Sequence, residues 1–92
     1  MKISFEQLTV SSTVKSLTES KYIAMNKCWA RVTVGTAGIR FQLDGSNPTG
    51  ESGETLAVGD ILTLNNLIEI KQFRAIRDGS TDAEMRVHYF ES

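Results

Sequence analysis

Apolar residues recur at every second position through most of the chain. This period is typical of β-strands that bury one face and expose the other. In the segment CWARVTV, residues 28–34, the small and aliphatic side chains fall on one face, and Trp29, Arg31 and Thr33 fall on the other. The segment AEMRVHYF, residues 83–90, alternates in the same way. Both segments are therefore expected to be strands that face a hydrophobic core.

Turn-forming residues separate several segments of this kind. Short strands punctuated by turns are typical of sandwiches and barrels. We expect a single all-β domain over residues 1–92, an immunoglobulin-like β-sandwich of about seven short antiparallel strands, with a small β-barrel as the alternative. Residues 17–25 are the one helical candidate, with Thr18 as N-cap, and an irregular crossover between sheets explains them equally well. The expected strands are residues 5–10, 28–34, 39–43, 55–58, 61–64, 73–77 and 83–90.

The strands at 28–34 and 39–43 are predicted to form a hairpin, because the Gly35–Gly38 connection is short and rich in glycine. Trp and Arg are enriched in binding hot spots. If the strands pair in this way, a shared face forms a possible interface with another subunit. The alternative for the tryptophan is burial beneath residues 17–25. The residues of this possible interface are Trp29, Arg31, Arg40 and Arg74.

A long polar loop interrupts the stretch IRFQLDGSNPTGESGETLAVGD, residues 39–60. Asp44 is expected to accept hydrogen bonds from the backbone of the following turn, with Gly45 in a left-handed conformation. Pro48 fixes one backbone angle and orders the loop in advance. This structural interpretation rests on Asp44, Gly45, Asn47, Pro48 and Thr49, and a ligand-binding role for residues 44–53 stays open.

The charge balance argues against several kinds of partner. Ten basic and eleven acidic residues give a net charge of -1, and no basic stripe is present, so we expect no nucleic-acid partner. No polybasic or lipidation signal and no apolar run of about 18 residues points to a membrane. Glu6 and Gln7 interrupt the apolar region that a signal peptide would need. A soluble protein made in the cytoplasm is the expectation.

The inventory of reactive side chains is small. Cys28 and His88 are the single cysteine and the single histidine, which excludes an internal disulfide and a tetrahedral zinc site in a monomer. A catalytic dyad would require both side chains on one face of adjacent strands. The acids around the polar loop lack the spacing of a calcium-binding loop. We therefore expect no enzymatic activity, no catalytic residue, no metal site and no cofactor.

The segment IRFQLDGSNPT, residues 39–49, is similar to the IRYTLDGTEPT type of strand and loop. That pattern occurs in small immunoglobulin-like sandwiches appended to bacterial carbohydrate-active enzymes. This resemblance implies an alternative function as a carbohydrate-binding or adhesion module.

A longer resemblance covers about two thirds of the chain, from Ala30 to Phe90. Its motifs are a strand before IRF..DG..PT, a glycine-rich segment, L..GD, FRAIR and a final strand of the A..RVHY type, in that order. The chain resembles a group of small proteins encoded among virion-morphogenesis genes of tailed bacteriophages and prophages. The resemblance implies a structural or accessory component of the particle that contacts other virion proteins and forms a homo-oligomer. Such a protein would be made in the host cytoplasm and reside in the virion.

Overall fold

The computed structural model describes residues 2–25, 27–49 and 51–91. Within these residues the chain forms seven β-strands, one short α-helix and one 3-10 turn. The strand bounds are β1 Ile3–Val10, β2 Cys28–Gly35, β3 Ile39–Gln42, β4 Glu54–Leu56, β5 Ile61–Leu64, β6 Arg74–Arg77 and β7 Ala83–Glu91. The α-helix α1 spans Leu67–Gln72, and the 3-10 turn η1 spans Glu19–Lys21.

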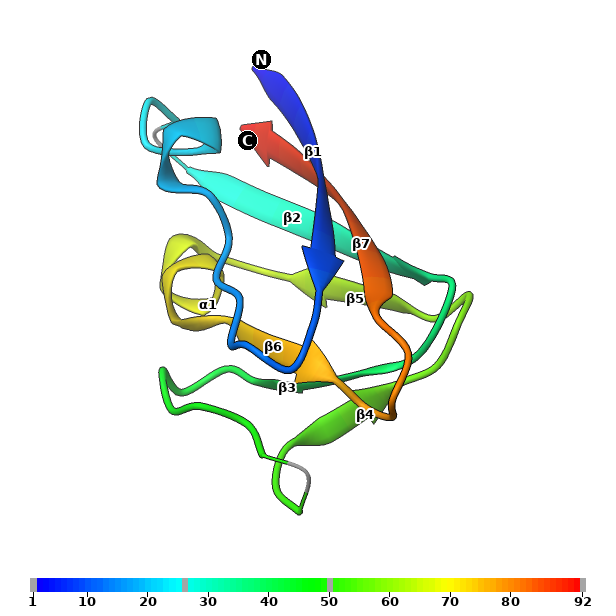
Figure 1. The fold of residues 1–92 in the computed structure, drawn as a ribbon. Helices are drawn as coiled ribbons and strands as arrows, with labels where there is room; N and C mark the ends of the chain where they lie inside the picture. Colours follow the sequence, from blue (N-terminus) through cyan, green and yellow to red (C-terminus); the bar gives the residue numbers. More distant parts are fainter. Residues whose placement is uncertain (1, 26, 50, 92) are drawn as a thin grey trace.

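The described strands form two antiparallel sheets (Figure 1). Sheet A has the order β1-β7-β2-β5, and sheet B has the order β4-β3-β6. Strand β7 occupies the interior of sheet A, where it pairs along its whole length with β1 on one side and β2 on the other. Both chain termini lie at one end of the molecule, and the start of β4 lies toward the opposite end. The longest dimension of the molecule is 38 Å.

The prediction of an all-β sandwich is confirmed. The described strands form two separate sheets and not a closed barrel, so the barrel alternative does not hold. The likeness to an immunoglobulin domain is one of architecture, since two antiparallel sheets pack over a shared core. The strand order is different, because β1 pairs with the last strand, β7, and β2 pairs with β7 and β5.

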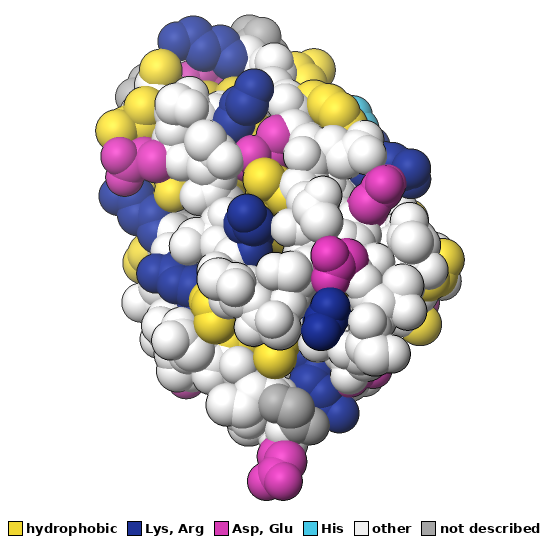
Figure 2. All heavy atoms as spheres, viewed as in Figure 1, with side chains coloured by type: hydrophobic (Ala, Val, Ile, Leu, Met, Phe, Trp, Pro, Cys, Tyr) yellow, Lys and Arg dark blue, Asp and Glu magenta, His cyan; other side chains and the backbone are white. Residues whose placement is uncertain are grey.

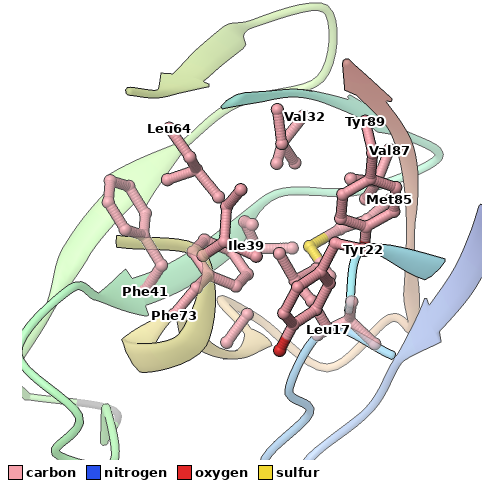
Figure 3. Packing of buried hydrophobic residues seen from close by; sticks show 14 of the residues in the cluster. Leu17, Tyr22, Val32, Ile39, Phe41, Leu64, Phe73, Met85, Val87 and Tyr89 are labelled. Carbon is pink, nitrogen blue, oxygen red and sulfur yellow. The ribbon is translucent and has the colours of Figure 1, made fainter. Parts of the chain in front are cut away.

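The core is the layer of apolar side chains between the two sheets. The alternation predicted for residues 28–34 and 83–90 holds, since every second side chain in β2 and β7 is buried. Figure 3 shows aromatic pairs at two places in this layer, Phe41 with Phe73 and Tyr22 with Tyr89. Burying an aliphatic or aromatic side chain contributes about 1.5–3 kcal/mol, so this layer is the main source of stability.

The predicted hairpin between the second and third strands is wrong. Strand β2 belongs to sheet A, and β3 belongs to sheet B, where it pairs with β4 and β6. The chain leaves β2 through Thr36, whose φ is 70°, and crosses from one layer to the other. The apolar faces of both strands are buried in the same core. Because the two strands lie in different sheets, their apolar faces meet across the core from opposite sides.

Helix α1 was not expected from the sequence. Its N-cap is Asn66, whose side-chain oxygen accepts a hydrogen bond of 2.9 Å from the backbone N–H of Glu69. The Glu69 carboxylate reaches back and accepts 2.7 Å from the backbone N–H of Asn65. These reciprocal bonds resemble a capping box and satisfy donors at the helix start. Ile70 is buried and anchors the helix to the core.

Glu6 is a buried acid that joins three parts of the chain. Its carboxylate accepts hydrogen bonds from the Tyr89 hydroxyl of β7, and from the hydroxyl and backbone N–H of Thr18. Thr18 precedes η1, so the segment predicted as helix or crossover is a single 3-10 turn held against β1. A buried acid is tolerated when its oxygens are hydrogen-bonded. The Glu6 carboxylate therefore fixes β1, β7 and the η1 segment relative to one another.

Replacement of Glu6 by alanine should destabilise the protein strongly. The Glu6→Ala variant leaves the Tyr89 hydroxyl and the Thr18 N–H without their acceptor, which we expect to lower the free energy of unfolding by about 2–4 kcal/mol. The Tyr89→Phe variant removes one donor and should cost less, about 1–2 kcal/mol. Urea unfolding measures both, with Glu19→Ala on the exposed part of η1 as the control, expected within about 0.5 kcal/mol of wild type. Equal stability of Glu6→Ala and Glu19→Ala would contradict this role.

Stability should fall at alkaline pH because of Tyr89. Burial, followed by the hydrogen bond to Glu6, raises the pKa of Tyr89 far above the ordinary tyrosine value of 10.0. The unfolded chain therefore releases this proton above pH 10.0 while the folded chain keeps it, so stability falls as pH rises, by about 1.4 kcal/mol per pH unit for the group. Urea unfolding at several pH values should show this slope, and Tyr89→Phe should reduce it. Identical slopes in the two proteins would exclude Tyr89 as the cause.

Candidate functional site

The outer face of sheet A carries aromatic side chains from three strands. The register places Phe5 of β1 and Arg31 of β2 on either side of His88 in β7. In the next row, Ile3 and Trp29 flank Phe90 in the same way. All six side chains point away from the core, because the alternate positions of each strand are the buried ones. We call this surface the aromatic face and define it as Ile3, Phe5, Trp29, Arg31, His88 and Phe90.

The rings of the aromatic face pack against one another. The Trp29 and Phe90 rings stack with centroids 4.2 Å apart and an interplanar angle of 16°. Phe5 lies 4.6 Å from His88, and His88 lies 6.2 Å from Phe90, centroid to centroid. The Arg31 guanidinium lies over the Phe90 ring at 5.6 Å, within the range of a cation–π contact. These contacts hold the surface rings in one arrangement and so limit the entropy that a partner would lose on binding.

Part of this aromatic cluster is open to solvent. Ile3 is 60% exposed and Phe5 is 43% exposed, while Trp29, His88 and Phe90 are half-buried by one another. Figure 2 shows hydrophobic side chains gathered beside the histidine side chain at the upper right edge of the molecule. Grouped apolar side chains on a surface mark an interaction site more often than single ones do. The aromatic face is therefore the candidate functional site.

The charged side chains on this side of sheet A are mostly basic. Arg31 and Arg86 lie on the outer side of β2 and β7. Glu84 is an acid on the same side of β7, and its carboxylate accepts 3.0 Å from the Gln7 amide and contacts Arg86 at 3.5 Å. The Arg31 guanidinium therefore lies beside the aromatic rings, which favours a partner that carries carboxylates.

The structure brings together half of the interface predicted from the sequence. Trp29 and Arg31 lie side by side on the aromatic face. Arg40 and Arg74 lie on the outer face of sheet B, because β3 and β6 belong to that sheet. Arg40 Nε is 2.7 Å from Asp78 in an ion pair that lacks the alignment of a hydrogen bond. Arg74 donates 2.8 Å hydrogen bonds to the carbonyls of residues 71 and 73. Neither of these arginines can contribute to the aromatic face.

Trp29 does not lie beneath residues 17–25. That segment sends Tyr22 into the core, where its ring stacks on Tyr89 at 5.7 Å. Tyr89 belongs to the inner face of β7, whereas Trp29 pairs with Phe90 on the outer face. The segment and the tryptophan are therefore on opposite sides of sheet A.

Sequence reasoning missed Phe5, Ile3 and Phe90 as members of the site. The alternation places Phe90 and His88 on the polar face of residues 83–90, but it does not say which strands lie beside them. Phe5 reaches His88 only because β1 pairs with β7, and those strands are at opposite ends of the chain. The sequence signal for Ile3 and Phe5 was their alternation with Ser4 and Glu6, which places the two apolar residues on one face of the strand.

The polar loop after β3 is held by its own hydrogen bonds. Asp44 Oδ1 accepts a hydrogen bond of 3.0 Å from the backbone N–H of Ser46, which closes an Asx-turn. Gly45 within this turn has the expected left-handed conformation, with a φ of 85°. The hydrogen bonds from Ser46 lower the pKa of Asp44. Pro48 is buried, Asn47 is exposed, and the Thr49 hydroxyl accepts 3.1 Å from the backbone N–H of Ser52. The structural interpretation of this loop accounts for its shape.

A hollow of about 300 Å³ lies beside this loop. It is lined by Phe41, Gln42, Leu43, Asp44 and Glu54. The aromatic and aliphatic residues provide an apolar floor, and the two carboxylates belong to exposed residues at its margin. The hollow combines apolar surface with negative charge. Its lining residues belong to β3, the polar loop and β4, which lie away from the termini in Figure 1.

Cys28 and His88 do not form a dyad. Cys28 is on the buried face of β2, where burial raises the pKa of its thiol. His88 is on the outer face of β7, against Phe5. The two side chains lie on opposite faces of sheet A.

Within residues 2–25, 27–49 and 51–91, no group of three or more His, Cys, Asp or Glu side chains is arranged to hold a metal ion. In the same ranges, no helix has the length and apolarity needed to cross a membrane. No protein-family model, no curated protein and no solved structure matches the chain.

Two glycines at positive φ should differ in their tolerance of alanine. Gly53 in the polar loop has a φ of 108°, and an added Cβ would lie 3.1 Å from the Phe41 carbonyl oxygen and 3.1 Å from Pro48 Cβ. Gly59 has a φ of 90° and open space around it. Gly59→Ala should therefore cost about 1 kcal/mol from backbone strain, and Gly53→Ala about 2–3 kcal/mol from strain and crowding. Thermal and urea unfolding measure both, and a greater loss for Gly59→Ala would show that the loop is not packed as described.

Proposed function

We propose that the chain is a non-enzymatic structural or accessory component of a bacteriophage or prophage particle, and that it acts through protein–protein contacts of the aromatic face. The observation that supports contacts through the aromatic face is the cluster of Trp29, Phe90 and Arg31 beside the exposed Phe5. The order of five motifs between Ala30 and Phe90 supports the role in a phage particle.

The composition of the aromatic face suits a protein partner. Aromatic residues and arginine are enriched at protein interfaces, and Trp, Tyr and Arg supply most of the binding energy in hot spots. Trp29 and Phe90 are already ordered by their mutual stacking at 4.2 Å. A partner that covered Phe5 and Ile3 would gain hydrophobic free energy at small entropic cost. The separation of Cys28 from His88 on the two faces of sheet A agrees with a role that needs no chemistry.

Carbohydrate binding or adhesion is the second candidate, because sugar sites also use exposed aromatic rings with polar neighbours. One observation favours it: Phe5 and Trp29 lie beside Arg31 and Gln7 on one open sheet face. The stacking of Phe90 against Trp29 counts against it, since one face of the indole is already covered. A sugar needs a free ring face, whereas a protein side chain can also pack against ring edges.

Purified phage particles should contain the protein, and the amount incorporated should depend on the aromatic face. In a host from which particles can be induced, we expect mass spectrometry to find the wild-type chain in gradient-purified particles. The Phe5→Ser/Arg31→Glu variant should be incorporated at least about tenfold less, since that corresponds to about 1.4 kcal/mol of lost contact energy. The Lys21→Glu variant is the matched control, because Lys21 is an exposed cation on η1 outside the aromatic face.

Absence of the wild-type chain from particles while it is abundant in the producing cell would overturn the particle assignment. Equal incorporation of both variants would overturn the assignment to the aromatic face. Binding on a glycan array that Trp29→Ala abolishes would replace the proposal with the carbohydrate candidate.

A further inference from the structure

One stretch of the chain carries acidic residues and no basic ones. Between Arg40 and Lys71 the sequence contains no lysine or arginine. This stretch forms the second half of β3, the polar loop, β4, β5 and most of α1. Its acids are Asp44, Glu51, Glu54, Asp60 and Glu69. Since the whole chain has a net charge of -1, the remainder of the molecule is basic overall.

The hollow beside the polar loop lies within this acidic stretch. Phe41 and Leu43 form its floor, and Asp44 and Glu54 flank it. The Asp44 carboxylate is held in place by Ser46, and those hydrogen bonds lower its pKa, so it carries its charge at neutral pH. A cation attached to an apolar or aromatic group could therefore contact the carboxylates with its charge and the apolar floor of this hollow with the rest of its surface.

The aromatic face presents the complementary chemistry. The Arg31 guanidinium lies against the Phe90 ring, and Arg86 is exposed on the same side of sheet A. The apolar side chains of the face lie beside the Arg31 guanidinium. One surface of the chain thus carries aromatic rings with cations, and another carries an apolar floor with carboxylates.

The two surfaces cannot meet within one molecule. The row of Ile3, Phe90 and Trp29 is at the start of β1 and β2 and at the end of β7, near the termini. The polar loop lies at the other end of the molecule (Figure 1), and the longest dimension is 38 Å. Contact between them requires a second copy of the chain.

We propose that the aromatic face of one copy docks on the acidic hollow of a second copy, with the Arg31 guanidinium seated between the Asp44 and Glu54 carboxylates. The proposal rests on the proposed function for its use of the aromatic face, and it adds the identity of the partner. A two-fold contact between two aromatic faces would instead bring the Arg31 guanidinium groups of both copies into one contact, and like charges oppose such a contact.

A contact between two different surfaces of one protein has a structural consequence. Each copy carries both surfaces, so two copies can dock reciprocally in a closed dimer, whereas a single contact continues head to tail until a ring closes. The assembly weakens with salt because charged groups hold it together.

Sedimentation velocity over a concentration series tests the proposal. The wild type should increase in mass to a dimer or a larger assembly as its concentration rises to about 500 µM, and addition of about 0.5 M salt should weaken the association. Arg31→Glu and Glu54→Lys should each weaken it at least about tenfold, since each places like charges in the contact. The double variant Arg31→Glu/Glu54→Lys should associate more tightly than either single variant, because it exchanges the charges of that pair, but less tightly than the wild type, because Asp44 then faces the new glutamate. Lys21→Glu should behave as the wild type.

Both altered residues are exposed, so circular dichroism and melting temperature should confirm that every variant remains folded. A wild type that remains monomeric at every concentration would overturn the proposal, and so would a dimer that Glu54→Lys leaves intact. A double variant that associates no more tightly than the single variants would exclude the Arg31–Glu54 contact. A monomeric wild type that is still incorporated into particles would overturn the self-association and leave the proposed function standing. Self-association without incorporation into particles would support the docking of two copies and overturn the proposed function.

Discussion

The alternation of side chains along β7 is the constraint on which both the core and the aromatic face depend. Met85, Val87 and Tyr89 are fully buried on its inner side, while His88 and Phe90 build the cluster on its outer side. Because the side-chain period of a strand is two, a slip of one residue would move every one of these groups to the wrong face. The register that fills the core therefore also sets the geometry of the interaction surface.

The buried Glu6 carboxylate reinforces this register. Glu6 points inward from β1 and accepts the Tyr89 hydroxyl, while its neighbour Phe5 points outward and packs on His88. The hydrogen bond on the inner side and the ring contact on the outer side both require the same pairing of β1 with β7. Thr18 adds the η1 segment to the same carboxylate. A polar contact inside the molecule thus positions an apolar contact on its surface.

Local patterns predicted the strands and their faces, because alternation records which side of a strand is buried. They did not predict which strands pair, since pairing is decided by packing between distant parts of the chain. The short, glycine-rich Gly35–Gly38 connection therefore predicts a hairpin, although β2 and β3 lie in different sheets. Trp29 and Arg31 were identified as a surface pair from composition, but Phe5 could not be added to them without the β1–β7 pairing. The sequence analysis does not predict helix α1, although the capping pattern of Asn66 and Glu69 is a local signal for it.

Hydroxyl-radical footprinting of the native protein, at a concentration where it is monomeric, tests the two-faced register of sheet A most directly. Radicals oxidise methionine and aromatic side chains where solvent reaches them. The account predicts rapid oxidation of Phe5 and measurable oxidation of Trp29 and Phe90, with Met85 and Tyr89 protected until the protein is unfolded. Rapid oxidation of Met85 and Tyr89 in the native state, with Phe5 and Phe90 protected, would contradict it.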